Sequence, residues 1–301
     1  MIDLLEGRFF KTFIAVIEEK SFNRAAEKLG YVQSTVTHHI QLLERACGQK
    51  LFHRLSRGVK PTEAGLKLAK YAHQFVHLGL AVEEAMNESN LPKGTIYLSM
   101  HESFFVTRMA SLIRTFKLEF PQVQFRVETG YHTDVIDDVA QHVVDLGIVP
   151  RNPLRDDLHF YPLIQEELIF IASDELTSKV EADGMHILNG ESVISYGNSC
   201  IYHTQANKAL EEVGVEASSA IQYPSIEMIK QAVKCGIGIA LIPRIAAEKE
   251  LDEGISRSLP LNPRIFSTHG ILVNKDRDLN LPAQKFKSFV MDHFAYPQEP
   301  E

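Results

Sequence analysis

Apolar side chains recur at helical spacing along the first 46 residues, which predicts three consecutive helices. The first helix is expected over residues 4–19. Its inner face is formed by apolar residues three or four positions apart, namely Leu5, Phe9, Phe13, Val16 and Ile17. A short amphipathic helix is stable only when that face packs against neighbouring elements, so the pattern predicts a small helical domain.

The second and third predicted helices are separated by a turn that contains glycine. Ser21 can cap the second helix, residues 23–29, because its hydroxyl accepts a hydrogen bond from an N–H group there. Gly30 can end that helix in a left-handed conformation. The third helix, residues 33–46, keeps polar residues at its start: Gln33, Ser34, Thr35, Thr37 and His38. In helix-turn-helix proteins the start of the second helix contacts base edges, so this segment predicts a DNA reader.

A basic hairpin is predicted directly after the third helix. Leu51 and Phe52 anchor it, and its cations are suited to the phosphate backbone or the minor groove. The candidate DNA-binding residues are Ser21, Asn23, Gln33, Ser34, Thr35, Thr37, His38, His53, Arg54, Arg57 and Lys60. The alternative is a three-helix packing unit with a solvated basic loop.

One long helix is predicted over residues 63–88, which contain no proline. Its apolar residues are spaced three and four apart over nearly three heptads: Leu68, Tyr71, Phe75, Leu78, Val82 and Ala85. That spacing is typical of a helix that pairs with a second chain, and the alternative is a helix packed on its own domain. Residues 87–94 then indicate a hinge-like linker.

From residue 94 onward, β-forming runs alternate with helical segments. Strands at 95–100, 124–130 and 145–150, separated by helices, predict a βαβαβ lobe with a parallel sheet. A second α/β lobe is expected from strands at 167–173, 192–197, 217–223 and 238–243, with helices near 202–213 and 225–235. Residues 267–273 and a helix at 280–295 return to the first lobe. The two crossings, near Tyr161–Ile164 and Phe266–His269, are the expected hinge.

The charge of the chain is distributed unevenly. Its net charge is −8, yet residues 1–65 hold 10 Lys/Arg against 7 Asp/Glu, while the remainder holds 21 against 32. DNA binding needs a local positive surface, so the acidic total does not exclude it. The apolar runs are too short for a membrane helix, and the acidic start does not resemble a signal peptide. Three widely spaced cysteines fit a reducing cytoplasm.

Ligands of open α/β sheets bind beyond the carboxyl ends of the strands, and two lobes can enclose them there. The candidate effector-binding residues follow predicted strands: Ser99, Met100, His101, Ser103, Thr129, Gly130, Pro150, Asn198, Ser199, Cys200, Tyr202 and Ser225. Glu102 and Pro224 lie at the same strand ends. Glu102 either opposes an incoming anion or faces solvent as a favourable partner of its own helix dipole.

The N-terminal segment resembles the DNA-binding domain of LysR-type transcriptional regulators. The residues that match in identity and spacing are Phe13, Ser21, Phe22, Ala25, Ala26, Leu29, Gln33, Ser34, Val36, Ile40, Leu43, Glu44, Gly48, Leu51, Phe52, Arg54, Thr62, Ala64 and Gly65. Over residues 66 to about 295 the resemblance is looser but colinear. The chain departs from the family at Val32, Thr37, His38 and His39, where the family commonly has a capping, hydroxyl or basic residue.

The resemblance implies a winged helix-turn-helix at residues 1–62, a dimerising linker helix at 63–90 and a periplasmic-binding-protein-like effector domain at 91–301. Within that domain, lobe I comprises 91–162 and 268–301 and lobe II comprises 163–267. The implied partners are promoter double-stranded DNA, a small-molecule effector such as a small organic acid, and RNA polymerase. The chain is also expected to bind itself, as a dimer through the linker helix and a tetramer through the effector domains.

The sequence therefore predicts a cytoplasmic, nucleoid-associated transcriptional regulator gated by a small molecule between two α/β lobes. An alternative is a thiol-based redox sensor that acts through Cys200, whose place near a helix N-terminus would lower its pKa. Cys47 and Cys235 are expected to be packing residues. Neither a nucleophile elbow, a phosphate-binding loop nor a metal motif is present, so no enzymatic activity, cofactor or metal is expected.

Overall fold

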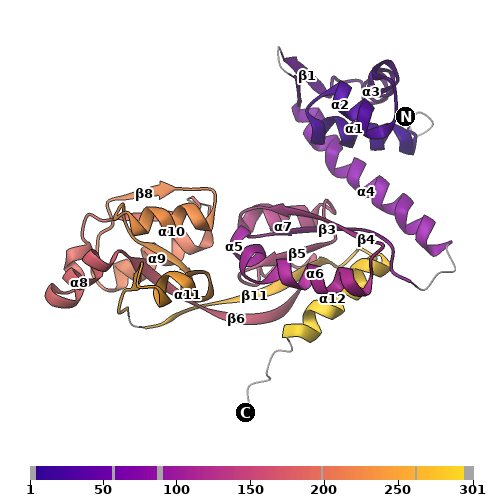
Figure 1. Cartoon of the computed structure of the whole chain (residues 1–301). Helices are drawn as coiled ribbons and strands as arrows, with labels where there is room; N and C mark the ends of the chain where they lie inside the picture. The colour runs from indigo at the N-terminus through magenta and orange to yellow at the C-terminus, as the bar shows by residue number, and fades with distance from the viewer. Residues whose placement is uncertain (1–4, 56–57, 87–90, 198, 262, 295–301) are drawn as a thin grey trace. The chain divides into compact units, whose positions relative to one another are not determined.

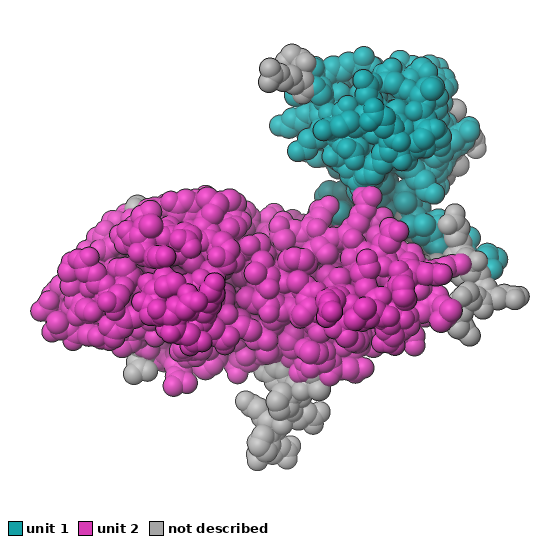
Figure 2. Space-filling model, viewed as in Figure 1, with its two compact units in different colours: residues 1–90, 141–143 teal, residues 91–140, 144–301 magenta. Residues whose placement is uncertain are grey.

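A computed structural model describes residues 5–55, 58–86, 91–197, 199–261 and 263–294. The chain divides into two compact units, residues 1–90 with 141–143 and residues 91–140 with 144–301 (Figure 2). No helix in the described ranges combines the length and the apolar character that a bilayer span requires. Figure 1 shows the helical N-terminal elements and the mixed α/β elements that follow them.

Three helices form the core of the first unit: α1 (Gly7–Glu19), α2 (Phe22–Leu29) and α3 (Gln33–Cys47). Phe13, Ala25 and Val36, one from each helix, are fully buried. The two alanines of α2, Ala25 and Ala26, have short side chains that allow the neighbouring helices to approach closely. The predicted helix boundaries agree to within a few residues. Helices α2 and α3 end at glycines, Gly30 and Gly48, whereas α1 ends at Lys20, which adopts φ 50°.

The ends of α2 show why it stops where it does. The Ser21 hydroxyl accepts a hydrogen bond from the Arg24 amide at 3.3 Å, as predicted for an N-cap. Gly30 adopts φ 67°, and its amide donates to the carbonyls of Ala26 and Glu27. By contrast, Val32 precedes α3 without any side-chain cap. The first turn of α3 therefore receives no side-chain acceptor from the residue before it.

A hairpin and a long helix complete the unit. Strands β1 (Phe52–Leu55) and β2 (Gly58–Pro61) pair antiparallel, and α4 (Glu63–Ala85) follows. The base of the hairpin is anchored by Leu51, which is 1 % exposed, and by the buried ring of Phe52. One face of α4 packs on the three-helix core through Leu68, Ala72 and Val76.

The second unit contains two lobes with separate hydrophobic cores. Lobe I is built from β3 (Gly94–Met100), α5 (Glu102–Phe104), the π-helical turn η2 (Phe105–Met109), α6 (Ala110–Glu119), β4 (Val123–Thr129), α7 (His132–Ala140), β5 (Leu146–Val149) and α12 (Leu281–Phe294). Strands β4, β3 and β5 are adjacent and parallel, which confirms the predicted βαβαβ pattern. The predicted first helix after β3 is continuous but contains the π-helical turn.

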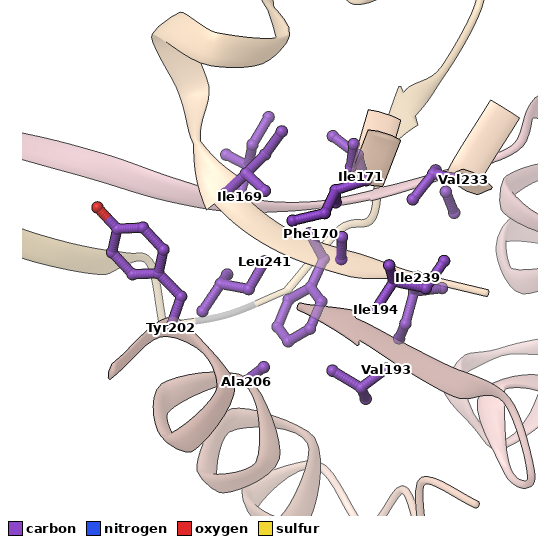
Figure 3. Packing of buried hydrophobic residues seen from close by; sticks show 14 of the residues in the cluster. Ile169, Phe170, Ile171, Val193, Ile194, Tyr202, Ala206, Val233, Ile239 and Leu241 are labelled. Carbon is purple, nitrogen blue, oxygen red and sulfur yellow. The ribbon is translucent and has the colours of Figure 1, made fainter. Parts of the chain in front are cut away.

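Lobe II surrounds a second group of strands. Its elements are α8 (Asp174–Asp183), the 3-10 turn η3 (Met185–Leu188), β7 (Ser192–Ser195), α9 (Ile201–Glu212), β8 (Ser219–Gln222), α10 (Ile226–Lys234), β9 (Ala240–Pro243), α11 (Arg244–Asp252) and β10 (Arg257–Ser258). Helices α8 and α11 were not predicted from the sequence. In the core, Phe170 and Ile194 pack among aliphatic residues, while the hydroxyl of Tyr202 points away from them (Figure 3).

Strands β6 (Leu158–Ala172) and β11 (Ile265–Asn274) run through both lobes and pair antiparallel along the whole of β11. The prediction assigned only residues 167–173 and 267–273 to strands, so the observed strands are longer. The two crossings expected near Tyr161–Ile164 and Phe266–His269 are neighbours in this ladder. A register shift between His269 and Gly270 interrupts it opposite Pro162, which has no amide hydrogen to donate.

Gly270 is required at the crossing because a Cβ there would collide with the Phe160 ring and the Tyr161 carbonyl oxygen. We therefore expect Gly270→Ala to lower the free energy of unfolding by about 1–3 kcal/mol, the usual cost of overpacking. Thermal unfolding of the purified protein measures this effect as a lower Tm.

Gly79→Ala is the matched control for this substitution. A Cβ at Gly79, on α4, meets no atom within 4 Å in the described part of the chain, so its Tm should not fall. Equal Tm values for the two variants would show that β6 and β11 do not approach this closely in solution.

Candidate functional site

The start of α3 presents polar side chains on the surface of the first unit. Gln33, Ser34 and His38 are exposed, and Thr35 and Thr37 are half-buried. The Gln33 amide nitrogen donates to the Thr37 hydroxyl at 2.8 Å, which orients the glutamine along the helix. A glutamine held in this way can offer its remaining donor and acceptor to a base edge.

His39, in contrast, is a packing residue. Its ring is 7 % exposed, contacts Phe9 at a centroid distance of 5.0 Å, and has Nδ1 2.9 Å from the Thr12 hydroxyl oxygen. Burial and the nearby Arg8 lower the pKa of His39, so the imidazole is uncharged at neutral pH. Of the two histidines that replace the family's basic residues, only His38 is available to a phosphate group.

The hairpin of β1 and β2, which we call the wing, carries exposed basic side chains. His53 and Lys60 face each other across β1 and β2, and both are exposed. The guanidinium carbon of exposed Arg54 lies 5.4 Å from the centroid of the Phe22 ring, which holds the arginine near the helical core. Arg57, also predicted to bind DNA, lies outside the described residues.

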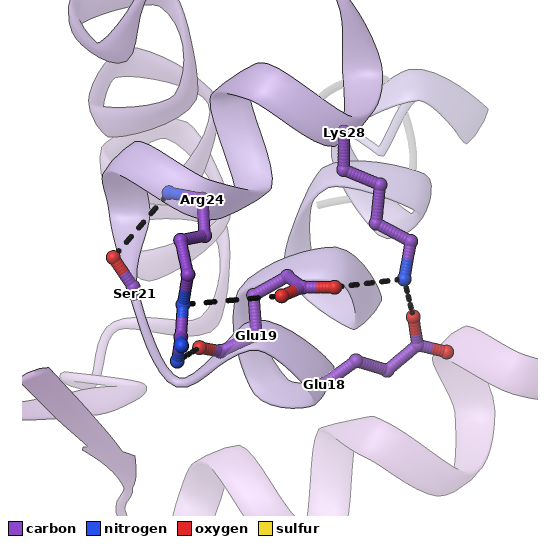
Figure 4. A network of polar contacts seen from close by, with 5 residues as sticks. All are labelled: Glu18, Glu19, Ser21, Arg24 and Lys28. Carbon is purple, nitrogen blue, oxygen red and sulfur yellow. Dashed lines mark hydrogen bonds and ion pairs between the residues drawn. The ribbon is translucent and has the colours of Figure 1, made fainter.

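Two further cations, on α2, are engaged with carboxylates of α1 (Figure 4). Lys28 Nζ lies 2.6 Å from Glu18 and 3.1 Å from Glu19, and Arg24 also pairs with Glu19 at 3.9 Å. The Ser21 hydroxyl oxygen is used as the N-cap of α2, whereas Asn23 is exposed. The positive surface offered to DNA is therefore concentrated on the wing and not on α2.

The other face of α4 carries an exposed apolar stripe. Tyr71, Phe75, Leu78 and Val82 are 66 %, 43 %, 65 % and 54 % exposed, at the predicted three- and four-residue spacing. Phe75 lies at the border of this stripe, because its ring also packs on Phe10 of α1 with centroids 4.7 Å apart. Leu68 differs from the prediction because it is half-buried against the core of its own unit. A row of large apolar side chains left in water is the usual mark of a protein–protein contact surface.

In the second unit, a cavity of about 270 Å³ opens between the two lobes. Lobe I contributes His101, Glu102, Thr129, Gly130, Tyr131 and Asp134, and lobe II contributes Tyr196 and Pro224. The Tyr131 hydroxyl donates to the carbonyl oxygen of Tyr196 at 2.7 Å, so the lobes touch at the edge of the cavity. We call this cavity the interlobe cleft.

Only part of the predicted effector set lines the cleft. His101, Thr129 and Gly130 lie in its wall, and Asn198 is outside the described residues. The buried side chains of Met100, Ser103, Pro150, Cys200 and Tyr202 lie behind the wall. Ser199 is exposed, and the Ser225 hydroxyl caps α10 by accepting from the Met228 amide at 3.3 Å. Apart from His101, Thr129 and Gly130, none of these described residues belongs to the lining of the cleft.

Ser99 is likewise absent from the lining of this cleft. Its hydroxyl donates to the Asp138 carboxylate of α7 at 2.9 Å, and the residue is 1 % exposed. Burial raises the pKa of Asp138 to about 6, although the Ser99 hydrogen bond works in the opposite direction. Ser99 therefore binds a half-buried carboxyl in lobe I and leaves the cleft wall to Thr129 and its neighbours.

Sequence reasoning missed Tyr131, Asp134 and Tyr196 as cleft residues. Tyr131 follows the glycine at the end of β4, and Tyr196 follows β7 directly. The rule that ligands meet the carboxyl ends of strands could have found both. Asp134, one turn into α7, gives no such signal, because its place in the wall depends on how the helix packs.

Behind the cleft, histidine and tyrosine side chains from the two lobes meet in a buried cluster. His101 packs edge-on against Tyr196 with ring centroids 4.3 Å apart, and the Tyr202 hydroxyl lies 3.2 Å from His269 Nε2. Burial lowers the pKa of His101 to about 4 and that of His269 to about 3. Both imidazoles are therefore neutral near pH 7, and they connect the lobes through hydrogen bonds and packing.

Cys200 does not have the lowered thiol pKa expected near a helix N-terminus. It is 1 % exposed, with Sγ 3.7 Å from His101 Nε2, and burial raises its pKa despite three backbone hydrogen bonds that act the other way. A buried thiol with a raised pKa is a poor nucleophile. Cys235 is exposed, which contradicts the packing role expected for it, whereas Cys47 is half-buried.

The fold and these two surfaces define a protein with a helix-turn-helix unit and a two-lobed ligand-binding unit. Residues 8–66 match the bacterial regulatory helix-turn-helix family of LysR proteins, and residues 89–295 match the LysR substrate binding domain. The chain belongs to the LysR family of transcriptional regulators.

Individual proteins agree with this assignment along nearly the whole chain. The uncharacterised HTH-type transcriptional regulator YusT of Bacillus subtilis is 30% identical over 292 residues, covering 97% of this chain and 96% of its own. A full-length OxyR variant from Pseudomonas aeruginosa has the same fold, with a TM-score of 0.70 and 18% identity over 99% of both chains. Full-length CbnR, solved with its target DNA, gives 0.66 and 15%, covering 96% and 100%.

The raised pKa of Asp138 predicts a pH-dependent stability. The folded protein binds this proton more tightly than the unfolded chain, whose pKa is near 3.8. Its contribution is therefore complete below about pH 4 and is lost as pH rises through about 6. Asp138→Asn keeps an acceptor for Ser99 and removes the charge, so it should raise Tm at pH 7.5 relative to the wild type, with little change at pH 4.

Asp183→Asn is the control for this comparison. Asp183 is an exposed residue of α8 in lobe II and is not among the charges that raise the pKa of Asp138, so its removal should leave this pH dependence of Tm unchanged. A wild-type profile for Asp138→Asn would contradict the burial of a titrating carboxyl at this position.

Proposed function

We propose that the protein is a ligand-gated regulator that binds promoter DNA through α3 and the wing and a small molecule in the interlobe cleft. One observation carries this proposal. A single LysR-family chain has both an exposed polar helix start with a basic wing and a cleft lined by two lobes. Ligand binding would favour one lobe arrangement and thereby alter DNA binding.

In this proposal the DNA-contacting residues have two different roles. Gln33, Ser34, Thr35, Thr37 and His38 lie at the helix start that enters the major groove, so they supply base contacts and nearby phosphate contacts. Ser21 and Asn23 adjoin the phosphate backbone at α2. His53, Arg54, Arg57 and Lys60 belong to the wing, where cations bind every sequence with similar strength.

Two chains would be joined through the apolar stripe of α4. Burying Tyr71, Phe75, Leu78 and Val82 against a second copy removes large apolar side chains from water, which is the main driving force of such an interface. A dimer places two recognition helices on two half-sites. The proposal also includes association of the effector domains into a tetramer and contact with RNA polymerase. It places the protein at the nucleoid in the cytoplasm.

The effector would contact the groups that line the cleft. Of the residues predicted to bind an effector, His101, Thr129 and Gly130 belong to this lining. The cleft offers hydroxyl, carboxylate and imidazole groups from both lobes, so a bound molecule would make contacts that exist fully only when the lobes are closed. A ligand changes the equilibrium between lobe arrangements only to the extent of such differential contacts.

The proposal is tested by the binding of the purified protein to DNA. Fluorescence anisotropy at fixed salt should show tighter binding to the region upstream of its own gene than to shuffled DNA of equal length. Equal affinity for the two DNA molecules would contradict a role as a sequence-specific regulator.

The two roles assigned to the DNA-contacting residues predict different effects of substitution on DNA binding. Gln33→Ala should weaken binding to the upstream DNA by about 1–3 kcal/mol and leave binding to shuffled DNA nearly unchanged, because it removes a base contact. Arg54→Ala should weaken both by a similar factor and reduce the salt dependence of binding, because it removes a phosphate contact. An equal loss of specificity in both variants would show that these contacts are assigned incorrectly.

A further inference from the structure

Glu102, in lobe I, binds two groups of lobe II across the interlobe cleft. Its Oε2 accepts a hydrogen bond from the Tyr196 hydroxyl at 2.7 Å and another from the Ile226 amide at 3.0 Å. Glu102 is half-buried and lies in the wall of the cleft. The side chain therefore faces the opposite lobe. This contradicts the alternative in which Glu102 faces solvent and interacts only with the dipole of its own helix.

Ile226, whose amide binds Glu102, is the first residue of α10, a helix of 9 residues. The N-terminus of such a helix carries a partial positive charge and exposed N–H groups, which is where proteins bind carboxylates and phosphates. In this chain two of these amides already have protein acceptors. Ile226 donates to Glu102, and Met228 donates to the Ser225 hydroxyl at 3.3 Å.

The remaining charges around the cleft do not favour a second anion. Asp134 adds another carboxylate, and the lining residues include neither Lys nor Arg among the described part of the chain. The nearby cation Arg151 is exposed and outside the lining, and Arg108 pairs with Glu166. A ligand carboxylate beside Glu102 would be repelled at close range without a cation to compensate.

We propose that Glu102 takes the place of a ligand anion at the N-terminus of α10, holds the two lobes together, and makes the cleft select an effector without a carboxylate. The matching ligand is a small neutral or positively charged molecule that donates N–H or O–H groups to Glu102 and Asp134. This inference rests on the proposed use of the cleft as the effector site. It replaces the small organic acid that the sequence resemblance implied.

Chemical rescue by acetate tests the proposal without DNA. We expect Glu102→Ala to lower the Tm of the full-length protein, because Tyr196 and Ile226 lose their acceptor. Sodium acetate, compared with sodium chloride at equal ionic strength, should then raise the Tm of Glu102→Ala by about 2–5 °C more than it raises that of the wild type, because acetate refills the vacated position. For the wild type, acetate and succinate should raise Tm only gradually and without saturation, as excluded anions do for proteins in general.

Three variants separate this outcome from a general effect of charge or folding. Glu119→Ala removes one exposed carboxylate from α6 and should show no acetate-specific rescue. Glu102→Gln keeps an oxygen acceptor and fills the site, so acetate should not stabilise it either. Glu102→Ser also vacates the position and replaces Glu102→Ala if that variant does not fold.

A saturable rise of the wild-type Tm at millimolar acetate or succinate would overturn the proposal, because it would show that the cleft binds a carboxylate. So would folded Glu102→Ala and Glu102→Ser variants that acetate does not stabilise. Because the readout is thermal unfolding of the protein alone, failure here is distinguishable from failure of the proposed function, which would appear as lost preference for the upstream DNA.

Discussion

The antiparallel pairing of β6 with β11 is the contact on which the second unit depends. These two strands are shared by both lobes, so each lobe folds around its own core while remaining attached to the other by adjacent strands. At the crossing, Pro162 cannot donate to the ladder, and Gly270 allows the close approach of Phe160. The ladder is therefore interrupted at the crossing between the lobes.

Two kinds of polar contact connect the lobes. Tyr131 and Glu102 bind lobe II groups beside the cleft, whereas His101 and His269 meet Tyr196 and Tyr202 in a buried cluster. Buried polar groups are costly when they lose their partners, so the cluster stabilises this arrangement of the lobes. A ligand acts on this balance by the difference between its contacts in the open and closed forms.

Local signals in the sequence predicted the first unit well. Ser21 and Gly30 terminate α2 by interactions with residues close in sequence, and the spacing of Phe9, Phe13 and Val16 requires only helical periodicity. The exposed stripe on α4 was predicted for the same reason. The burial of His39 was not, because its partners Thr12 and Phe9 lie on another helix.

The second unit was predicted less completely from the sequence. Alternation of strands and helices predicted a two-lobed α/β fold, but α8 and α11 were missed even though Ser173 caps α8. The cleft itself was predicted only in part, because the roles of Ser99 and Cys200 depend on distant neighbours. Ser99 bonds to Asp138, 39 residues away, and Cys200 is buried against His101, 99 residues away. Neither contact can be predicted from the spacing of residues along the chain.

The central claim is that two copies of the helix-turn-helix unit, joined through α4, read two half-sites. DNase footprinting on the region upstream of its gene tests this most directly, with the wild type and with Leu78→Asp, which places a charge in the exposed stripe. We predict two protected segments whose centres are separated by one or more helical turns, about 10 base pairs each, and the loss of both segments together in the variant. A single short protected segment that survives in Leu78→Asp would contradict the claim.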